Sequence, residues 1–98
     1  MKKAKVILIG AEDEENLAIR YLAAVLKKDG HEIKIVQCSK YEDFPKVLKI
    51  VSKYKPDLIG ISIAFQALAN MYFNLISEIR KRNFKGHITV GGHFPTLI

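Results

Sequence analysis

Apolar runs alternate with amphipathic stretches along the whole sequence, and this alternation constrains the fold more than any other feature. Four runs are typical of strands, namely residues 4–10 (AKVILIG), 32–37 (EIKIVQ), 56–65 (PDLIGISIAF) and 87–92 (HITVGG). Three stretches with apolar residues at helical spacing lie between them, at residues 14–30, 41–55 and 66–86. The order predicts an α/β fold, a doubly wound (flavodoxin-like or Rossmann-like) parallel sheet of four strands with three helices on its two faces.

Each expected helix carries a stripe of apolar residues that we expect to face the sheet. Gly30 marks the end of the first helix, and Pro45 is compatible with the first turn of the second. The run 32–37 alternates between apolar and polar residues, which is typical of a half-covered edge strand. The expected stripes are Leu17, Tyr21, Leu22, Val25 and Leu26, then Val47, Leu48, Val51 and Tyr54, then Leu68, Tyr72, Leu75, Ile76 and Ile79.

The length of 98 residues suits one domain. A complete doubly wound domain usually adds a further helix and a fifth strand, so we expect residues 1–98 to be a single domain cut from a longer chain, truncated before that strand. No apolar run approaches the ~20 residues of a membrane span. The single cysteine, Cys38, excludes an internal disulfide and is typical of a protein of the reducing cytoplasm.

Sixteen basic and ten acidic residues give a net charge of +6, which raises the possibility of a nucleic-acid partner. The basic residues cluster where helices are expected to end, for example at Lys27 and Lys28, and cations there complement the helix dipole. No aromatic residues alternate with the bases, as single-strand binding would require. We therefore expect no nucleic-acid partner, and polyanion binding through residues 80–85 remains an alternative.

The carboxyl edge of the sheet is where ligands bind in folds of this kind. Four loops meet there, at residues 11–15, 38–42, 64–67 and 91–96. The first loop has Gly10 alone where a dinucleotide fold needs G-x-G-x-x-G, and its four carboxylates would repel a pyrophosphate. These features argue against NAD binding.

Other common sites are also missing from this edge. A phosphoacceptor domain needs an aspartate at the end of the third strand, where this sequence has Ser62 and Ala64. Ser62 has no histidine or lysine nearby in the sequence, so a hydrolase is unsupported, and we expect no catalytic residue. The histidines and Cys38 show no paired metal-ligand spacing, so we expect no metal ligand either. Among the histidines, only His93 lies at the carboxyl edge.

Small side chains remain as the distinctive feature of the edge. Ser62 lies near the end of the third strand, and Gly91 with Gly92 end the fourth. Two neighbouring strand ends with so little bulk predict a slot for a flat group, in which Ser62 donates a hydrogen bond. The alternative is that the two glycines only begin a tight turn before Phe94.

These residues resemble a known family, the cobalamin-binding domain found at the N-terminus of many radical S-adenosylmethionine (radical SAM) enzymes. The family pattern is D-x-H-x-x-G, then S-x-L, then G-G. Here Ser62-Ile63-Ala64 matches the second motif, and Gly91-Gly92 follows after residues 65–90. The stretches 21–36, 56–62 and 90–97 are similar to the radical SAM branch, so the resemblance covers essentially the whole chain.

The resemblance implies that the dimethylbenzimidazole tail of cobalamin is buried in the slot, hydrogen-bonded by the serine and passing over the glycines. It implies a following radical SAM domain, with its 4Fe-4S cluster and S-adenosylmethionine, as partner in the parent chain. The residues expected to face the tail are Ser62, Ala64, Phe65, Gln66, Gly91, Gly92 and His93, and those expected to face the corrin ring are Ala11, Glu12 and Asn16.

One departure from the family pattern has a chemical consequence. The histidine that ligates cobalt would fall near Leu17, and residues 11–20 contain no histidine. We therefore predict that the tail is detached from cobalt and that no protein histidine replaces it. The C-x-x-x-C-x-x-C cluster of radical SAM enzymes is also absent, so this chain alone is not expected to catalyse a reaction. The alternative function is a degenerate α/β domain that has lost its cofactor and serves as a docking module.

Overall fold

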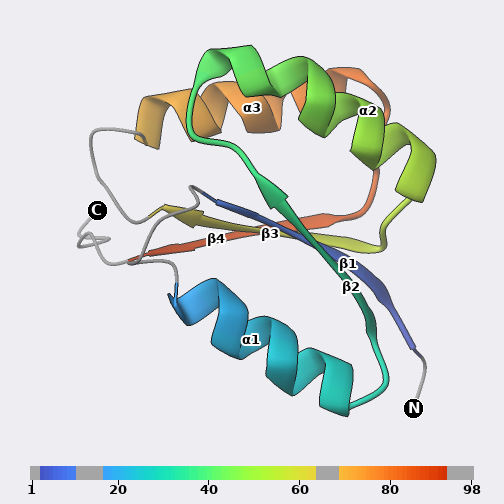
Figure 1. Ribbon diagram of the computed structural model, residues 1–98. Helices are drawn as coiled ribbons and strands as arrows, with labels where there is room; N and C mark the ends of the chain where they lie inside the picture. Colours follow the sequence, from blue (N-terminus) through green and yellow to red (C-terminus); the bar gives the residue numbers. More distant parts are fainter. Residues whose placement is uncertain (1–2, 11–16, 64–68, 93–98) are drawn as a thin grey trace.

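The computed structural model describes residues 3–10, 17–63 and 69–92. Within these ranges, strands and helices alternate in the predicted order (Figure 1). The strands are β1 (Lys5–Gly10), β2 (Glu32–Gln37), β3 (Leu58–Ile63) and β4 (His87–Gly92), and the helices are α1 (Leu17–Lys28), α2 (Phe44–Tyr54) and α3 (Ala69–Lys81). A single 3-10 turn, η2 (Tyr41–Asp43), precedes α2.

The four strands form one parallel sheet in the order β2-β1-β3-β4. This is a flavodoxin-like order, so the α/β fold class predicted from the alternation is confirmed. In the sheet, β2 lies on one side of β1, and β3 lies on the other side of β1. The strand order therefore reverses between β1 and β3, and β2 is an edge strand, as its alternating pattern predicted.

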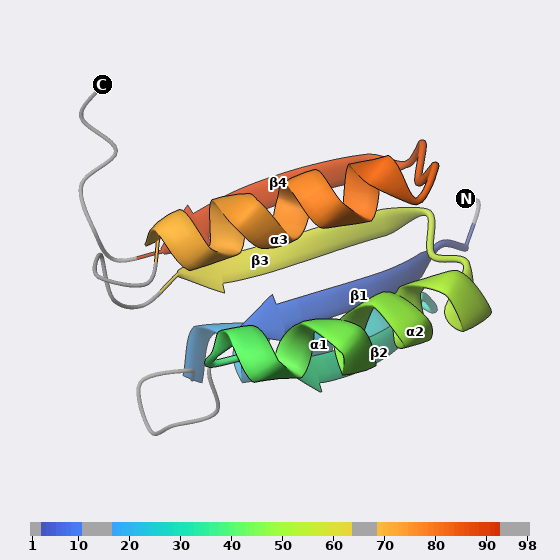
Figure 2. The same ribbon diagram turned by 90° about the horizontal axis from the view of Figure 1, so that it is seen from above.

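Alternate strand residues point to the two faces of the sheet, and a different helix layer covers each face (Figures 1 and 2). Helices α2 and α3 pack side by side on one face, over Ile7, Ile9 and the odd-numbered isoleucines of β3. Helix α1 packs on the other face, where Val6 and Leu8 contact Ala23. The larger core thus lies beneath α2 and α3.

The expected helix stripes are mostly confirmed, with one correction in α1. Val25 is 40% exposed, whereas Ala23 is buried at 5% and lies one turn before the partly buried Leu26. The stripe of α1 is therefore rotated from the expected position, because a small residue lets the helix approach the sheet. The side chains of residues 17–22 and residue Leu68 lie outside what the structure describes. Met71 joins the buried residues of α3.

The helices run antiparallel to the strands, so their last turns gather at the amino edge of the sheet. Lys27 and Lys28 lie in the last turn of α1, and Arg80 with Lys81 in that of α3, as the charge pattern predicted. Lys55 ends α2 in the left-handed conformation, with φ of 53°, which is unusual for a lysine. The carboxyl edge, at the opposite end, is left to the residues that follow the strands.

Candidate functional site

The register of the sheet aligns three small residues in one row across neighbouring strands. Gly10 at the end of β1 pairs with Ser62 of β3, and Ser62 pairs with Gly91 of β4. Residues paired in this way in a parallel sheet point to the same face, and Val6 and Leu8 identify that face as the one that α1 covers. The row spans the point between β1 and β3 where the strand order reverses, which is where such sheets bind ligands.

The space over this row is open at one end and bounded at the other. A Cβ atom placed on Gly91 would meet no atom of the described residues within 4 Å, and the side chain of Ser62 is only partly buried. One step toward the amino edge, a Cβ on Gly60 would lie 2.9 Å from Leu8 Cδ2. We call the row Gly10, Ser62 and Gly91, with Leu8 at its base, the small-residue slot.

Helix α1 covers only part of this face. It contacts β1 and β2, and Figure 2 shows it beneath that half of the sheet, while β3 and β4 extend beyond it. The side chains that β4 presents on this face are those of His87 and Thr89, both exposed, before Gly91. A flat group entering at Gly91 would thus lie on backbone and be flanked by α1.

The two adjacent glycines of β4 do not face the same way. Gly92 pairs with Ile63, whose side chain is fully buried under α2 and α3. Only the missing side chain of Gly91 therefore opens the slot, since neighbouring strand residues alternate between the two faces. Gly92 is the last residue of β4.

The loop after β2 is held in place beside the slot by buried hydrogen bonds. The backbone N–H of Cys38 donates to the Gly10 carbonyl oxygen (2.9 Å), and the Tyr72 hydroxyl donates to the Cys38 carbonyl oxygen (2.6 Å). The N–H of Ser39 donates to Asp43 Oδ2 (2.9 Å), which lowers the pKa of Asp43. These bonds fix the end of β2 to β1 and α3, and on the face of the slot the β2 residue that pairs with Gly10 is Gln37.

Cys38 is fully buried in the main core, where it packs as a small side chain. Burial, with a smaller contribution from the charge of Asp43, raises the pKa of the thiol to about 11. A thiol that stays protonated is a poor nucleophile and a poor metal ligand.

The histidines that the structure describes lie away from the slot. His31 Nδ1 accepts a hydrogen bond from the backbone N–H of Ala4 (3.0 Å), and His87 begins β4. Both lie at the amino edge, as expected from their positions in the sequence. The described ranges contain no group of three or more His, Cys, Asp or Glu residues arranged to hold a metal ion. Nor does any helix within these ranges have the length and apolar character needed to cross a membrane.

Three of the residues expected at the site are among those that the structure describes. Ser62, Gly91 and Gly92 are described, and the first two come together in the row. The others lie outside the described residues, and they are Ala11, Glu12, Asn16, Ala64, Phe65, Gln66 and His93.

Comparison with protein families identifies the ligand class. The family model described as "B12 binding domain" matches residues 5–98, nearly the whole chain. This chain belongs to the B12-binding domain family. Membership indicates cobalamin as the ligand. A comparison with curated proteins finds no match.

In this B12-binding domain, the small-residue slot combines backbone that carries no side chain at Gly10 and Gly91 with the hydroxyl of Ser62. The sequence reasoning singled out Ser62 and Gly91 but missed Gly10 and Gly60. The alternation of side chains along a strand could have indicated them, because every second residue of a strand faces the same way. Residues 60 and 62 of β3 therefore share a face with residues 89 and 91 of β4 once the register is known.

Proposed function

We propose that this chain is the cobalamin-binding domain of a radical SAM enzyme and that its small-residue slot holds the dimethylbenzimidazole tail of the cofactor. The observation that carries the proposal is the row Gly10, Ser62 and Gly91, where a Cβ on the last residue would meet no described atom within 4 Å. No other row of this sheet face has so few side-chain atoms. On β2 this row continues to Gln37, which pairs with Gly10, and the row one step away, Ile35, Leu8, Gly60 and Thr89, is filled by Leu8.

The roles of the residues follow from their positions. Ser62 Oγ donates a hydrogen bond to a ring nitrogen of the tail, and Gly91 leaves the space that the ring occupies. Leu8, buried and packed against Ala23, closes the bottom of the slot and excludes water there. When bound, cobalamin supplies a cobalt centre for alkyl-transfer or radical chemistry. The domain itself binds and orients the cofactor, and the reaction belongs to the radical SAM part of the parent chain.

The loops on either side complete the site in this proposal. In the sequence, residues 64–66 directly follow β3 and His93 directly follows β4, and the proposal assigns both segments to the tail. Ala11, Glu12 and Asn16, from the segment after β1, face the corrin ring. A tail buried in the slot is detached from cobalt, and no protein imidazole replaces it, because residues 11–20 contain no histidine.

Binding of hydroxocobalamin and of cobinamide, which lacks the nucleotide tail, tests the proposal. Each corrinoid is mixed with the protein and dialysed to equilibrium, and the retained visible absorbance is measured. We expect hydroxocobalamin to bind more tightly than cobinamide, because only hydroxocobalamin fills the slot. Its bound spectrum should be that of a corrinoid without a nitrogen ligand from tail or histidine.

A substitution in the slot and a matched control locate the binding. Gly91→Val places two methyl groups where the ring is expected and should weaken hydroxocobalamin binding at least tenfold. Val90→Leu adds bulk at the adjacent position on the opposite face and should leave the affinity unchanged. Equal affinities for cobinamide and hydroxocobalamin, or an unaltered Gly91→Val variant, would show that the tail does not enter the slot. A failure of both corrinoids to bind would favour the cofactor-free docking module.

A further inference from the structure

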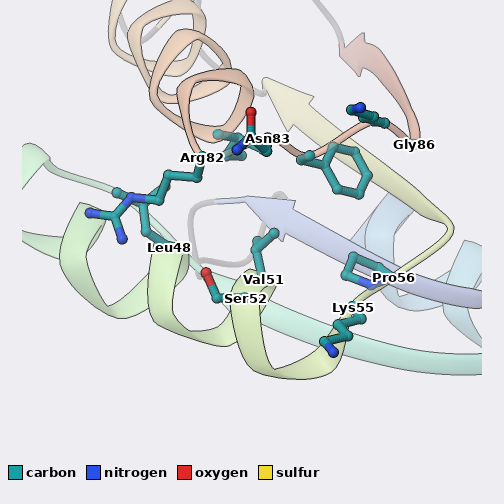
Figure 3. Close-up of a pocket in the computed structure, with 11 residues that line it drawn as sticks. Leu48, Val51, Ser52, Lys55, Pro56, Arg82, Asn83 and Gly86 are labelled. Carbon is teal, nitrogen blue, oxygen red and sulfur yellow. The ribbon is translucent and has the colours of Figure 1, made fainter.

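A hollow lies at the amino edge of the sheet, at the far end of the molecule from the small-residue slot. It is formed where α2 and α3 end and has a volume of about 430 Å³, within the range of ligand-binding pockets (Figure 3). All of its lining residues are described. We call it the helix-end cleft, and its residues are Leu48, Val51, Ser52, Lys55, Pro56, Ile79, Arg82, Asn83, Phe84, Lys85 and Gly86.

The floor of the helix-end cleft is apolar. Leu48 and Val51 of α2 and Ile79 of α3 are buried residues of the main core, and Pro56 is buried beside them. Phe84 packs partly buried against the same core. A ligand that enters the cleft therefore meets hydrocarbon at its base.

The rim of the cleft carries three cations and no carboxylate. Lys55, Arg82 and Lys85 are exposed, and no Asp or Glu is among the lining residues. Figure 3 shows Lys55 at the end of α2 and Arg82 at the end of α3. None of the three forms an ion pair with any residue that the structure describes. The ion pair found among the described residues joins Lys81 and Glu78. Their charge is therefore available to a ligand.

Arg80, by contrast, serves the fold. Its guanidinium Nη1 donates to the carbonyl oxygens of Phe84 (3.0 Å) and Gly86 (2.8 Å), and it lies 5.5 Å from the centroid of the Phe84 ring. These contacts hold the turn between α3 and β4, so one wall of the cleft is formed before any ligand arrives. They also remove Arg80 from the polyanion patch that the run 80–85 suggested.

The cleft continues along the seam between α2 and α3. An adjoining hollow of about 470 Å³, lined by Tyr41, Phe44 and residues of α3, shares Leu48 and Arg82 with it. This hollow also contains Glu78, which pairs with Lys81, so the unpaired cations lie at the helix-end cleft. Together the two hollows make an elongated groove with a cationic end. An extended chain fits such a shape better than a compact small molecule does. The apolar floor distinguishes the groove from a nucleic-acid site, which needs cations in register with successive phosphates.

We propose that the helix-end cleft docks an acidic segment of a partner protein, one in which carboxylates flank a large apolar side chain. The apolar side chain lies on Phe84 and on the edges of Leu48 and Val51, and the carboxylates meet Lys55, Arg82 and Lys85. Docking here leaves the carboxyl edge free, so the segment and a ligand of the small-residue slot bind independently.

Short labelled peptides test the proposal by fluorescence anisotropy. The probe is the acetylated hexapeptide EELFEE carrying fluorescein, with QQLFQQ and EESSEE as matched peptides that lack the charges or the apolar pair. We expect EELFEE to bind most tightly, with an affinity that falls as salt rises. Two-dimensional NMR should show shifted amides at Ser52, Lys55, Asn83 and Gly86. Equal binding of EESSEE, or equal competition by single-stranded oligothymidylate, would mean that the cleft is only a polyanion surface and would overturn the proposal.

Two variants separate the cleft from the general positive charge of the protein. Lys85→Glu should weaken EELFEE binding about tenfold, whereas Lys27→Glu, the same charge change at the end of α1, should weaken it less than about twofold. Lys55→Gly should weaken binding about threefold without unfolding the protein, because glycine accepts the left-handed conformation at this position. Equal losses in Lys85→Glu and Lys27→Glu, or amide shifts centred on Ser62 and Gly91, would refute the assignment.

Discussion

Two glycines at opposite ends of β4 offer a direct measurement of whether the small-residue slot is open. A Cβ at Gly91 would meet no described atom within 4 Å, whereas a Cβ at Gly86 would lie 2.5 Å from Phe84 Cζ and 2.6 Å from the Asp57 carbonyl oxygen. The Asp57 oxygen belongs to backbone and accepts the N–H of His87 (3.3 Å), so it has little freedom to move. The same change to alanine should therefore have opposite effects at the two positions.

The expected magnitudes follow from these contacts. Alanine at Gly91 removes backbone freedom from the unfolded chain without a clash, so we expect the free energy of unfolding to rise by up to about 1 kcal/mol. At Gly86 the overlap costs about 1–3 kcal/mol, as overpacking does elsewhere. The two variants should differ by about 1–4 kcal/mol, and a difference of about 2 kcal/mol corresponds to roughly a thirtyfold difference in the unfolding equilibrium constant.

Urea denaturation followed by far-ultraviolet circular dichroism measures both variants under one condition. The slope of free energy against urea should be the same in all three proteins, so that midpoints report stability directly. If Gly91→Ala were destabilised as strongly as Gly86→Ala, a protein group would occupy the space above Gly91. The slot would then be closed, and the proposed cobalamin site would lose its main support.

Two further predictions concern the loop after β2. Because burial raises the pKa of Cys38 to about 11, the thiol should not react with a disulfide reagent at mildly alkaline pH until urea unfolds the protein, and rapid reaction of the native protein would contradict its burial. The Ser39 N–H lowers the pKa of Asp43 from 3.8, so Asp43 stabilises the fold above that value and loses this contribution as the pH falls through the lower, folded-state pKa. Asp43→Asn should therefore lose less stability on acidification than the parent protein, and equal losses would contradict this role.

The alternation of apolar and amphipathic segments was sufficient to predict the fold. It predicted β4 at residues 87–92, the bounds observed, because the glycines and the apolar run end together. Helix bounds were predicted less well. The segment 41–55 begins with the turn η2 and becomes α-helical only from Phe44, next to Pro45, since proline is compatible with the first turn of a helix.

Packing between elements was harder to predict than the elements themselves. Helical periodicity is as consistent with a buried stripe through Val25 and Leu26 as with one through Ala23 and Leu26. Which of the two stripes is buried depends on how closely α1 approaches Val6 and Leu8. The slot has the same origin. Ser62 and Gly91 are recognisable as small residues in the sequence, but only the register between β3 and β4 aligns them and turns Gly92 to the other face.

The separation of the two proposed sites is a consequence of parallel topology. Because every helix runs back against its strand, residues that follow strands meet at one edge and residues that end helices meet at the other. Cations that complement the helix dipoles therefore gather at the amino edge, and most need no partner to explain them. Lys55, Arg82 and Lys85 differ from the rest because they surround a hollow floored by Leu48 and Val51. Dipole compensation explains a cation at a helix end, but it does not explain a hollow with an apolar base beside that cation. A docking segment would use both the cation and the apolar base.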